Sequence, residues 1–76
     1  MDYRHVFATN LRRLRTEKGY SQEALAHEAG VNRTYMSKLE KGGSFVGLEL
    51  MVKLATVLQV EPADFLKVPA RKSRRT

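Results

Sequence analysis

The amino-acid sequence predicts a single all-α domain built from five short helices. Apolar residues recur three and four positions apart along most of the chain. Hydroxyl and amide residues stand where helices would begin, and glycines stand where they would end. No segment of β-branched residues alternates with period two, so no strand is expected. A chain of 76 residues without cysteine has room for one core, and neither disulfides nor a thiolate metal site can stabilise it.

The first two helices are predicted from their apolar spacing and their end signals. The first is expected over residues 3–18, and Gly19 supplies the left-handed residue that ends it. On this helix, Arg12 is expected to face away from the core. The second helix begins after Ser21, whose hydroxyl is a good N-cap, and it stops at Gly30.

Three more helices are expected after that glycine. Asn32 is a second N-cap, for a helix over residues 33–41. A fourth helix is expected over residues 48–58. The segment "VEPADFL", residues 60–66, is expected to form a short fifth helix with Pro62 in its first position. The buried stripe of the fourth helix is expected to consist of Leu48, Met51, Leu54, Ala55 and Leu58.

The net charge of +6 comes almost entirely from the C-terminal end. Residues 67–76 contain five cations and no acid, whereas residues 1–66 contain nine cations and eight acids, a net charge of only +1. The sequence therefore divides into a nearly neutral folded domain, residues 1–66, and a basic tail, residues 67–76, that is expected to be disordered. Three interpretations of the tail stay open: a solubilising end, a phosphate-binding extension, or a remnant of cloning.

The helix over residues 33–41 has two different sides when its residues are placed 100° apart. One side carries Tyr35, Met36 and Leu39, which anchor so short a helix to the domain. Glu40 lies at the boundary. Arginine and lysine can bond guanine or phosphate, and a threonine methyl can pack on thymine. The side with these residue types carries Arg33, Thr34, Ser37, Lys38 and Lys41.

A charged helix side is most often simply solvated. Here, however, the helix follows another capped helix across a tight glycine turn, and this order is typical of a helix-turn-helix unit. In such a unit the second helix enters the DNA major groove.

The segment "SQEALAHEAGVNRTYMSKLEKG" resembles the helix-turn-helix of the Cro/repressor-like (XRE) family of transcriptional regulators. The small residue of that motif falls on Ala26, its turn glycine on Gly30, and its buried aliphatic positions on Met36 and Leu39. The flanking segments "LRRLRTEKGYSQ" and "GLELMVKLATVLQVEPADFL" are similar to the family's other helices, so the resemblance covers residues 4–66. The wording "NRTYMSKLEKG" is particularly close to restriction–modification controller proteins, although short phage repressors and antitoxins share much of it.

This resemblance implies specific roles for residues of the chain. Base-reading positions fall on Arg33, Thr34 and Lys38, with Ser37 between them. Arg15 and Glu40 match a pair that forms a salt bridge between the first and third helices of family members. Contacts to the DNA backbone are implied or suggested for Gln22, Asn32, Tyr35, Lys41 and Ser44.

A homodimer is expected, because one recognition helix reads only about four or five base pairs, and regulators of this kind pair two such helices. A second apolar edge of the fourth helix and the residues after it offers an interface. The expected interface residues are Leu50, Val57, Val60, Phe65 and Val68. The alternative is a monomer in which the fifth helix folds over Leu50 and Phe65.

An enzyme is not expected. His5 and His27 lack the neighbours of a zinc or general-base site, and "GGSFVG" lacks the lysine of a phosphate-binding loop. No cofactor, small-molecule ligand or membrane span is expected. Without a signal pattern after Met1, the chain is expected to be cytoplasmic. The sequence thus predicts a double-stranded DNA-binding regulator acting on a roughly palindromic operator, and the alternative is an antitoxin-like module whose main partner is a protein.

Overall fold

The computed structural model describes residues 2–68. It contains four α-helices, α1 (Tyr3–Glu17), α2 (Gln22–Ala29), α3 (Arg33–Glu40) and α4 (Leu48–Leu58), followed by the 3-10 helix η1 (Pro62–Leu66). No strand occurs among the described residues, which confirms the all-α prediction. The predicted number of five α-helices is wrong, because the last segment forms a 3-10 turn. The predicted tail lies outside the described residues except for Lys67 and Val68.

The short segment η1 is 3-10 rather than α-helical because other groups hold its ends. The side chains of Glu61 and Asp64 form a reciprocal capping box, and Pro62 donates no backbone hydrogen bond. Near the C-terminal end, the Asn10 Nδ2 group of α1 donates to the carbonyls of Phe65 and Lys67, at 2.8 and 2.9 Å. These two carbonyls therefore accept hydrogen bonds from α1 and not from the backbone N–H groups of a longer helix. Hydrogen bonds from Lys67 and from the Glu61 backbone lower the pKa of Asp64.

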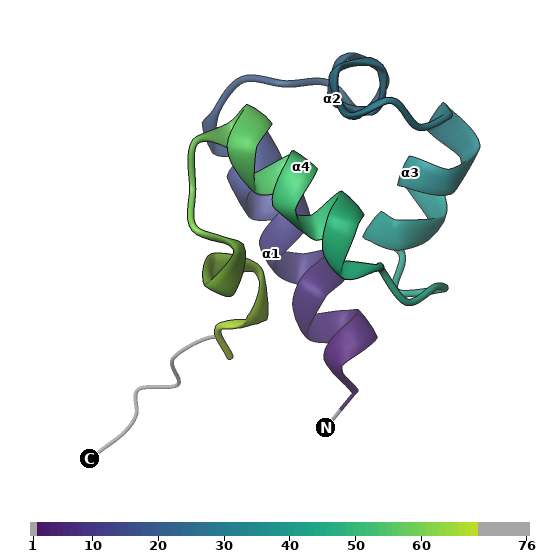
Figure 1. Cartoon of the computed structure of the whole chain (residues 1–76). Coiled ribbons are helices and arrows are strands. Elements are labelled where there is room, and N and C mark those ends of the chain that lie inside the picture. Colours follow the sequence, from purple (N-terminus) through teal and green to yellow (C-terminus); the bar gives the residue numbers. More distant parts are fainter. Residues whose placement is uncertain (1, 69–76) are drawn as a thin grey trace.

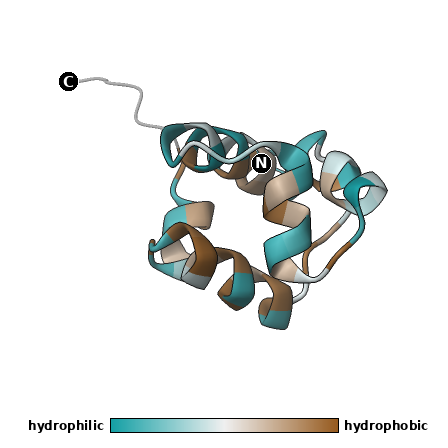
Figure 2. Cartoon of the chain, turned by 90° about the horizontal axis from the view of Figure 1, so that it is seen from above, coloured by the Kyte–Doolittle hydropathy of each residue, from teal (hydrophilic) through white to brown (hydrophobic). Residues whose placement is uncertain are grey.

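α1 runs between η1 and α3, and α2 packs on both α3 and α4 (Figure 1). Hydrophobic and hydrophilic positions alternate along the helices, as expected when each has one buried side (Figure 2). The rings of Phe7 and Phe65 meet in the core with centroids 5.2 Å apart. The core is formed by Phe7, Leu11, Leu14, Leu25, Ala26, Ala29, Met36, Leu39, Met51, Leu54, Ala55, Leu58 and Phe65.

Two sequence predictions about apolar residues are wrong. Leu48 was expected in the core, but it is 77% exposed because it occupies the first turn of α4, beyond the neighbouring elements. Phe65 was expected at a dimer interface, but it is fully buried against α1. Of the other residues expected there, Leu50, Val57 and Val60 are partly buried against the core.

The predicted N-caps of α2 and α3 are confirmed, as is the glycine that ends α2. Ser21 Oγ accepts a hydrogen bond from the Ala24 N–H at 3.0 Å, and Asn32 Oδ1 accepts from the Tyr35 N–H at 2.7 Å. Gly30 ends α2 in the left-handed conformation at φ +75°. The turn between the two helices is therefore held by a cap at each start and a glycine between them.

A buried carboxylate joins α1, α2 and α3. The Glu40 side chain, only 2% exposed, accepts hydrogen bonds from Arg15 Nε at 2.5 Å and from Arg15 Nη2 at 3.0 Å. Gln22 Nε2 at the start of α2 donates to the same carboxylate at 3.0 Å. Arg12 Nη1 donates to the backbone carbonyl of Glu40, so the last residue of α3 is held through both its side chain and its main chain. The structure thus contains the Arg15–Glu40 ion pair that the resemblance implies, with two further donors.

Replacing Glu40 with glutamine should destabilise the fold strongly. The change leaves the Arg15 guanidinium, which is only 17% exposed, without its counter-charge. Breaking a buried pair from one side costs about 3 kcal/mol, and a domain of this size loses roughly 4–8 °C in Tm for each kcal/mol. Thermal unfolding followed by circular dichroism should therefore show a fall in Tm of more than about 10 °C. The matched control is Glu17→Gln, which breaks the exposed Arg13–Glu17 pair and should change stability by less than about 1 kcal/mol. Equal shifts for the two variants would contradict the special role of Glu40.

Gly42 should tolerate alanine less well than Gly30, although both have φ near +75°. A Cβ at Gly42 would lie 2.8 Å from the Nδ1 of His5, whereas a Cβ at Gly30 meets nothing within 4 Å. Both variants carry the strain of a left-handed alanine, about 1–2 kcal/mol, and only Gly42→Ala adds a clash. Urea unfolding should show the larger loss of unfolding free energy for Gly42→Ala. Combining Gly42→Ala with His5→Ala should remove the difference from Gly30→Ala. Equal losses in the two single variants would refute the contact.

Candidate nucleic-acid interface

The burial of Met36 and Leu39 determines which side of α3 faces outward. Met36 and Leu39 are fully buried in the core, so the opposite side of this eight-residue helix must face solvent. Along that side Ser37 is half-buried. The exposed side chains there are those of Arg33, Thr34, Lys38 and Lys41, the last being the C-cap residue.

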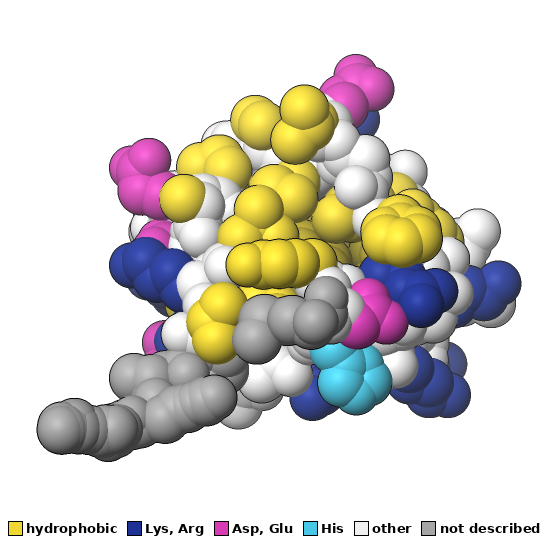
Figure 3. All heavy atoms as spheres, turned by 90° about the horizontal axis from the view of Figure 1, so that it is seen from below, with side chains coloured by type: hydrophobic (Ala, Val, Ile, Leu, Met, Phe, Trp, Pro, Cys, Tyr) yellow, Lys and Arg dark blue, Asp and Glu magenta, His cyan; other side chains and the backbone are white. Residues whose placement is uncertain are grey.

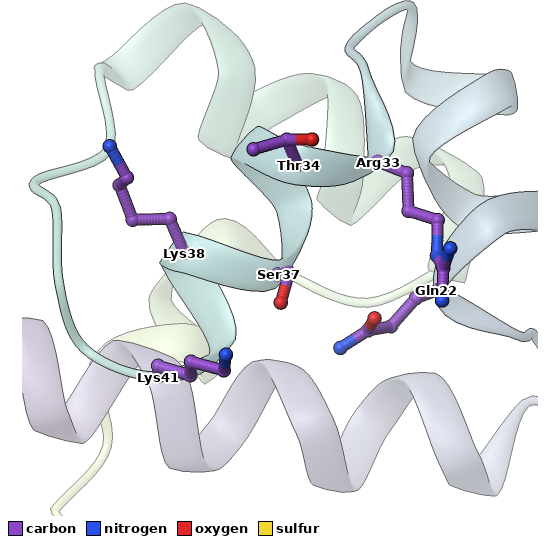
Figure 4. A pocket seen from close by; sticks show the side chains of 6 residues that line it. All are labelled: Gln22, Arg33, Thr34, Ser37, Lys38 and Lys41. Atoms are coloured by element: carbon purple, nitrogen blue, oxygen red, sulfur yellow. The ribbon is translucent and has the colours of Figure 1, made fainter.

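These side chains line a single groove together with Gln22 from the start of α2. The groove has a volume of about 560 Å³ and is lined by Gln22, Arg33, Thr34, Ser37, Lys38 and Lys41. Figure 4 shows the Arg33 side chain extending toward Gln22, and Lys41 lying beside α1. The structure therefore brings together all four predicted base-reading residues and two of the predicted backbone-binding residues.

The groove is positively charged although the domain as a whole is nearly neutral. Its lining contains three cations, Arg33, Lys38 and Lys41, and no acidic residue. Glu40 is the acidic residue of α3, and Arg15 neutralises it beneath the surface. The amino end of α2 also lies here, and its free backbone N–H groups and helix dipole favour an anion. Cations, hydroxyls and an amide on a rigid surface can bind phosphates and the edges of bases.

Three other predicted DNA-contacting residues do not line this groove. The Asn32 side chain is used to cap α3. The Tyr35 ring packs against the core, and its hydroxyl donates weakly to the Phe45 carbonyl at 3.4 Å. Ser44 lines a separate small groove of about 120 Å³ next to the amino end of α1. All three residues are close to α3 in the sequence. However, the side chains of Asn32 and Tyr35 bond backbone groups, and Ser44 lines a different groove.

One arginine, Arg12, and one glutamine, Gln22, make contacts that the sequence analysis did not predict. Arg12 was expected to face away from the domain, yet it reaches the main-chain carbonyl at the end of α3. Its position three residues before Arg15 places both on one side of α1, and this spacing was the available signal. Gln22 was expected to bind phosphate, but in this structure its amide nitrogen donates to Glu40.

Residues 2–68 contain no group of three or more His, Asp or Glu side chains placed to hold a metal ion. Among the helices of this region, none has the length and apolar character needed to cross a lipid bilayer.

Known proteins of similar sequence include a transcription factor and a control protein. A hypothetical transcription factor from Neisseria meningitidis is 40% identical over 68 residues, covering 90% of this chain and 64% of the relative, so the chain spans slightly less than two thirds of that protein. The control protein C.BamHI from Bacillus amyloliquefaciens is 39% identical over 64 residues, covering 83% of this chain and 79% of the relative.

Two solved structures resemble this chain in both fold and sequence. The restriction–modification controller protein C.AhdI from Aeromonas hydrophila has a TM-score of 0.78 at 44% identity, covering 82% of this chain and 94% of that protein. The Neisseria transcription factor has a TM-score of 0.84 at 40% identity, covering 90% and 78% respectively. The helix-turn-helix family model HTH_3 matches residues 11–65, which include α2, α3 and the whole groove. The chain therefore belongs to the XRE-type helix-turn-helix family HTH_3.

Proposed function

We propose that this protein is a transcriptional regulator that binds double-stranded DNA sequence-specifically, with α3 in the major groove. The observation that carries the proposal is the groove between α2 and α3, where three cations, two hydroxyls and an amide form one surface without an acidic residue. The major groove of B-DNA is about 12 Å wide and admits one α-helix. Relatives named as control proteins or transcription factors support this function.

Each groove residue is assigned a role by its chemistry and position. Arg33 and Lys38 are five residues apart, at the two edges of the outward side of α3, and each can bond guanine O6 and N7. Thr34 offers a methyl group for thymine, and Ser37 offers a short donor or acceptor close to the base edges. We assign these four residues to base reading.

The remaining groove residues are assigned to the phosphates. Lys41 lies at the C-terminal end of α3, where a long cation can reach a neighbouring phosphate. Gln22 lies at the amino end of α2, where helix N–H groups favour an anion. Asn32, Tyr35 and Ser44 are weaker assignments of the same kind, because their side chains lie outside the groove.

We further propose that two copies act together on a roughly palindromic operator. One α3 helix reads too few base pairs for useful selectivity in a genome, whereas two helices about 34 Å apart can read successive turns of the groove. A protein-partner function such as that of an antitoxin is less well supported at α3. A protein-binding surface is expected to have a central apolar or aromatic anchor, and the exposed side of α3 has none.

Selection of bound duplexes from a random DNA pool should yield an inverted repeat for the wild-type chain. The variant Arg33→Ala should lose information at one matched position in each half-site, because a bidentate arginine–guanine contact is worth about 1–3 kcal/mol of discrimination. Sequencing the selected pools measures both outcomes. No enriched motif for the wild-type chain, with binding that only weakens as salt rises, would contradict the proposed function.

Lys41→Ala should weaken binding to all duplexes alike. Loss of one phosphate contact per bound copy reduces the slope of log affinity against log salt by about 0.9 for each copy, without changing sequence preference. Titrations at several salt concentrations, with a specific and a scrambled duplex, measure this slope. Arg13→Ala is the matched control, because Arg13 is an exposed cation of α1 that bonds Glu17 and Asn10 instead of lining the groove. An equal fall in slope for both variants would show that Lys41 acts only through the overall charge.

A further inference from the structure

Three of the four arginines of α1 form ion pairs with acidic residues, and one does not. Arg12 is the exception among residues 2–68, and it is exposed to solvent. No neighbouring carboxylate neutralises its charge within this part of the chain, so the guanidinium is available to an anion from outside the protein. The three ion pairs are Arg4–Asp2, Arg13–Glu17 and Arg15–Glu40.

Arg12 lies at the carboxyl end of α3. Its Nη1 group donates a hydrogen bond to the main-chain carbonyl of Glu40, the last residue of that helix. The next residue, Lys41, lines the groove and lies beside α1 (Figure 4). The cations of the groove therefore continue from α3 onto α1. A bond to one carbonyl uses only one of the five N–H donors of a guanidinium, so the other donors of Arg12 can bind a second acceptor.

The side of α1 that carries Arg12 is exposed and has no acidic residue. At 100° per residue, His5, Thr9 and Thr16 lie within about 60° of Arg12, and all three are exposed. A Cβ at Gly42 would lie 2.8 Å from the Nδ1 of His5, so this side of α1 also passes the residues that follow α3. Figure 3 shows basic side chains gathered on the side of the molecule where α3 lies, next to the hydrophobic side chains in the middle of that view.

The width of the major groove determines what an element packed beside α3 would meet. The groove is about 12 Å wide, and an α-helix with its side chains has a diameter of about 10–12 Å. A helix that enters the groove therefore fills it, and an element packed directly beside that helix faces the phosphates along the edge. α1 packs on α3 in this way. Its exposed cation at the contact, Arg12, has the planar donor geometry that binds two phosphate oxygens at once.

We propose that Arg12 binds a phosphate at the edge of the major groove that α3 occupies, so that α1 is a third helix of the DNA interface. This contact rests on the proposed function and adds an element to its binding surface. The same guanidinium holds the main-chain end of α3, so the bound phosphate also fixes the position of α3 relative to the DNA backbone. Phosphate contacts set the register of a protein on the duplex in this manner.

Arg12→Ala should reduce the slope of log affinity against log salt by about 0.9 for each bound copy. Arg12→Gln removes the charge but keeps a donor for the Glu40 carbonyl, so it should show the same fall even if Arg12→Ala does not fold. Arg12→Lys keeps a cation and should keep the wild-type slope. The matched control is Arg13→Ala, which removes the next cation of α1, one that is paired with Glu17. Unchanged slopes for the uncharged Arg12 variants, or an equal fall for Arg13→Ala, would overturn the proposal.

Replacement of single phosphates separates a DNA contact from a purely structural role of Arg12. In a series of duplexes, one phosphate at a time is changed to an uncharged methylphosphonate, and affinity is measured for the wild type and for Arg12→Gln. At one phosphate in each half-site, the replacement should weaken the wild type about fivefold or more and the variant less than about twofold. Lys41→Ala should lose its sensitivity at a different phosphate. Parallel losses for the wild type and Arg12→Gln at every phosphate would overturn the contact.

Selection of duplexes from a random pool separates this contact from the proposed function. Arg12→Gln should enrich the same motif as the wild type, because a phosphate contact carries no sequence information. A wild-type chain that enriches no motif, but whose salt slope still falls with Arg12→Gln, would overturn the sequence-specific function and leave the phosphate contact of α1 intact. A wild-type chain that enriches an inverted repeat, with the same phosphate map as Arg12→Gln, would overturn the contact and leave the function intact.

Discussion

The fold of this domain depends on one buried carboxylate, that of Glu40. α3 has only eight residues, too few to be stable as a separate helix in water. Its apolar side chains fix its position on the core, but they do not prevent a small rotation about the contact. Arg15, Gln22 and Arg12 bind Glu40 from two other helices, and together they hold the last turn of α3 in one orientation. A helix that reads base edges must present its side chains in a constant geometry, and the ion pair supplies this constraint in the proposed function.

The same interaction explains why the groove is positive. Residues 1–66 have a net charge of only +1, so the total charge of the domain does not attract DNA strongly. The acidic residue of α3 points inward and is neutralised, whereas the cations of that helix point outward. Charge placement, rather than composition, therefore makes this surface positive. Gln22 belongs to both the groove and the buried ion pair, because it lines the groove and also bonds the Glu40 carboxylate.

Much of the fold follows from local sequence signals, and the failures occur where neighbouring elements decide. Ser21, Gly30 and Asn32 mark the turn between α2 and α3 because caps and left-handed glycines act within a few residues. Periodicity indicates which side of α4 is apolar, but it does not indicate how far the covering elements extend. Leu48 was therefore placed in the core, although it lies beyond it. Phe65 was placed on the surface because nothing local shows that Asn10 draws η1 onto α1.

The site shows the same division between local and distant information. The residues on the outer side of α3 were predictable, because one helix sets their spacing and Met36 and Leu39 set its inward side. The contact of Gln22 with Glu40 spans two helices and could not be predicted from spacing. The side-chain partners of Tyr35 and Ser44 depend on the loop between α3 and α4, whose path has no sequence signature.

We propose that α3, held in place by Glu40, is the DNA-binding surface. The most direct measurement is a titration of the ¹⁵N-labelled chain with a bound duplex, following the amide chemical shifts of each residue. The largest shifts are expected at Gln22 and over residues 33–41, which contain the lining of the groove. Shifts centred on η1 or on the α4 surface, with α3 unchanged, would contradict it.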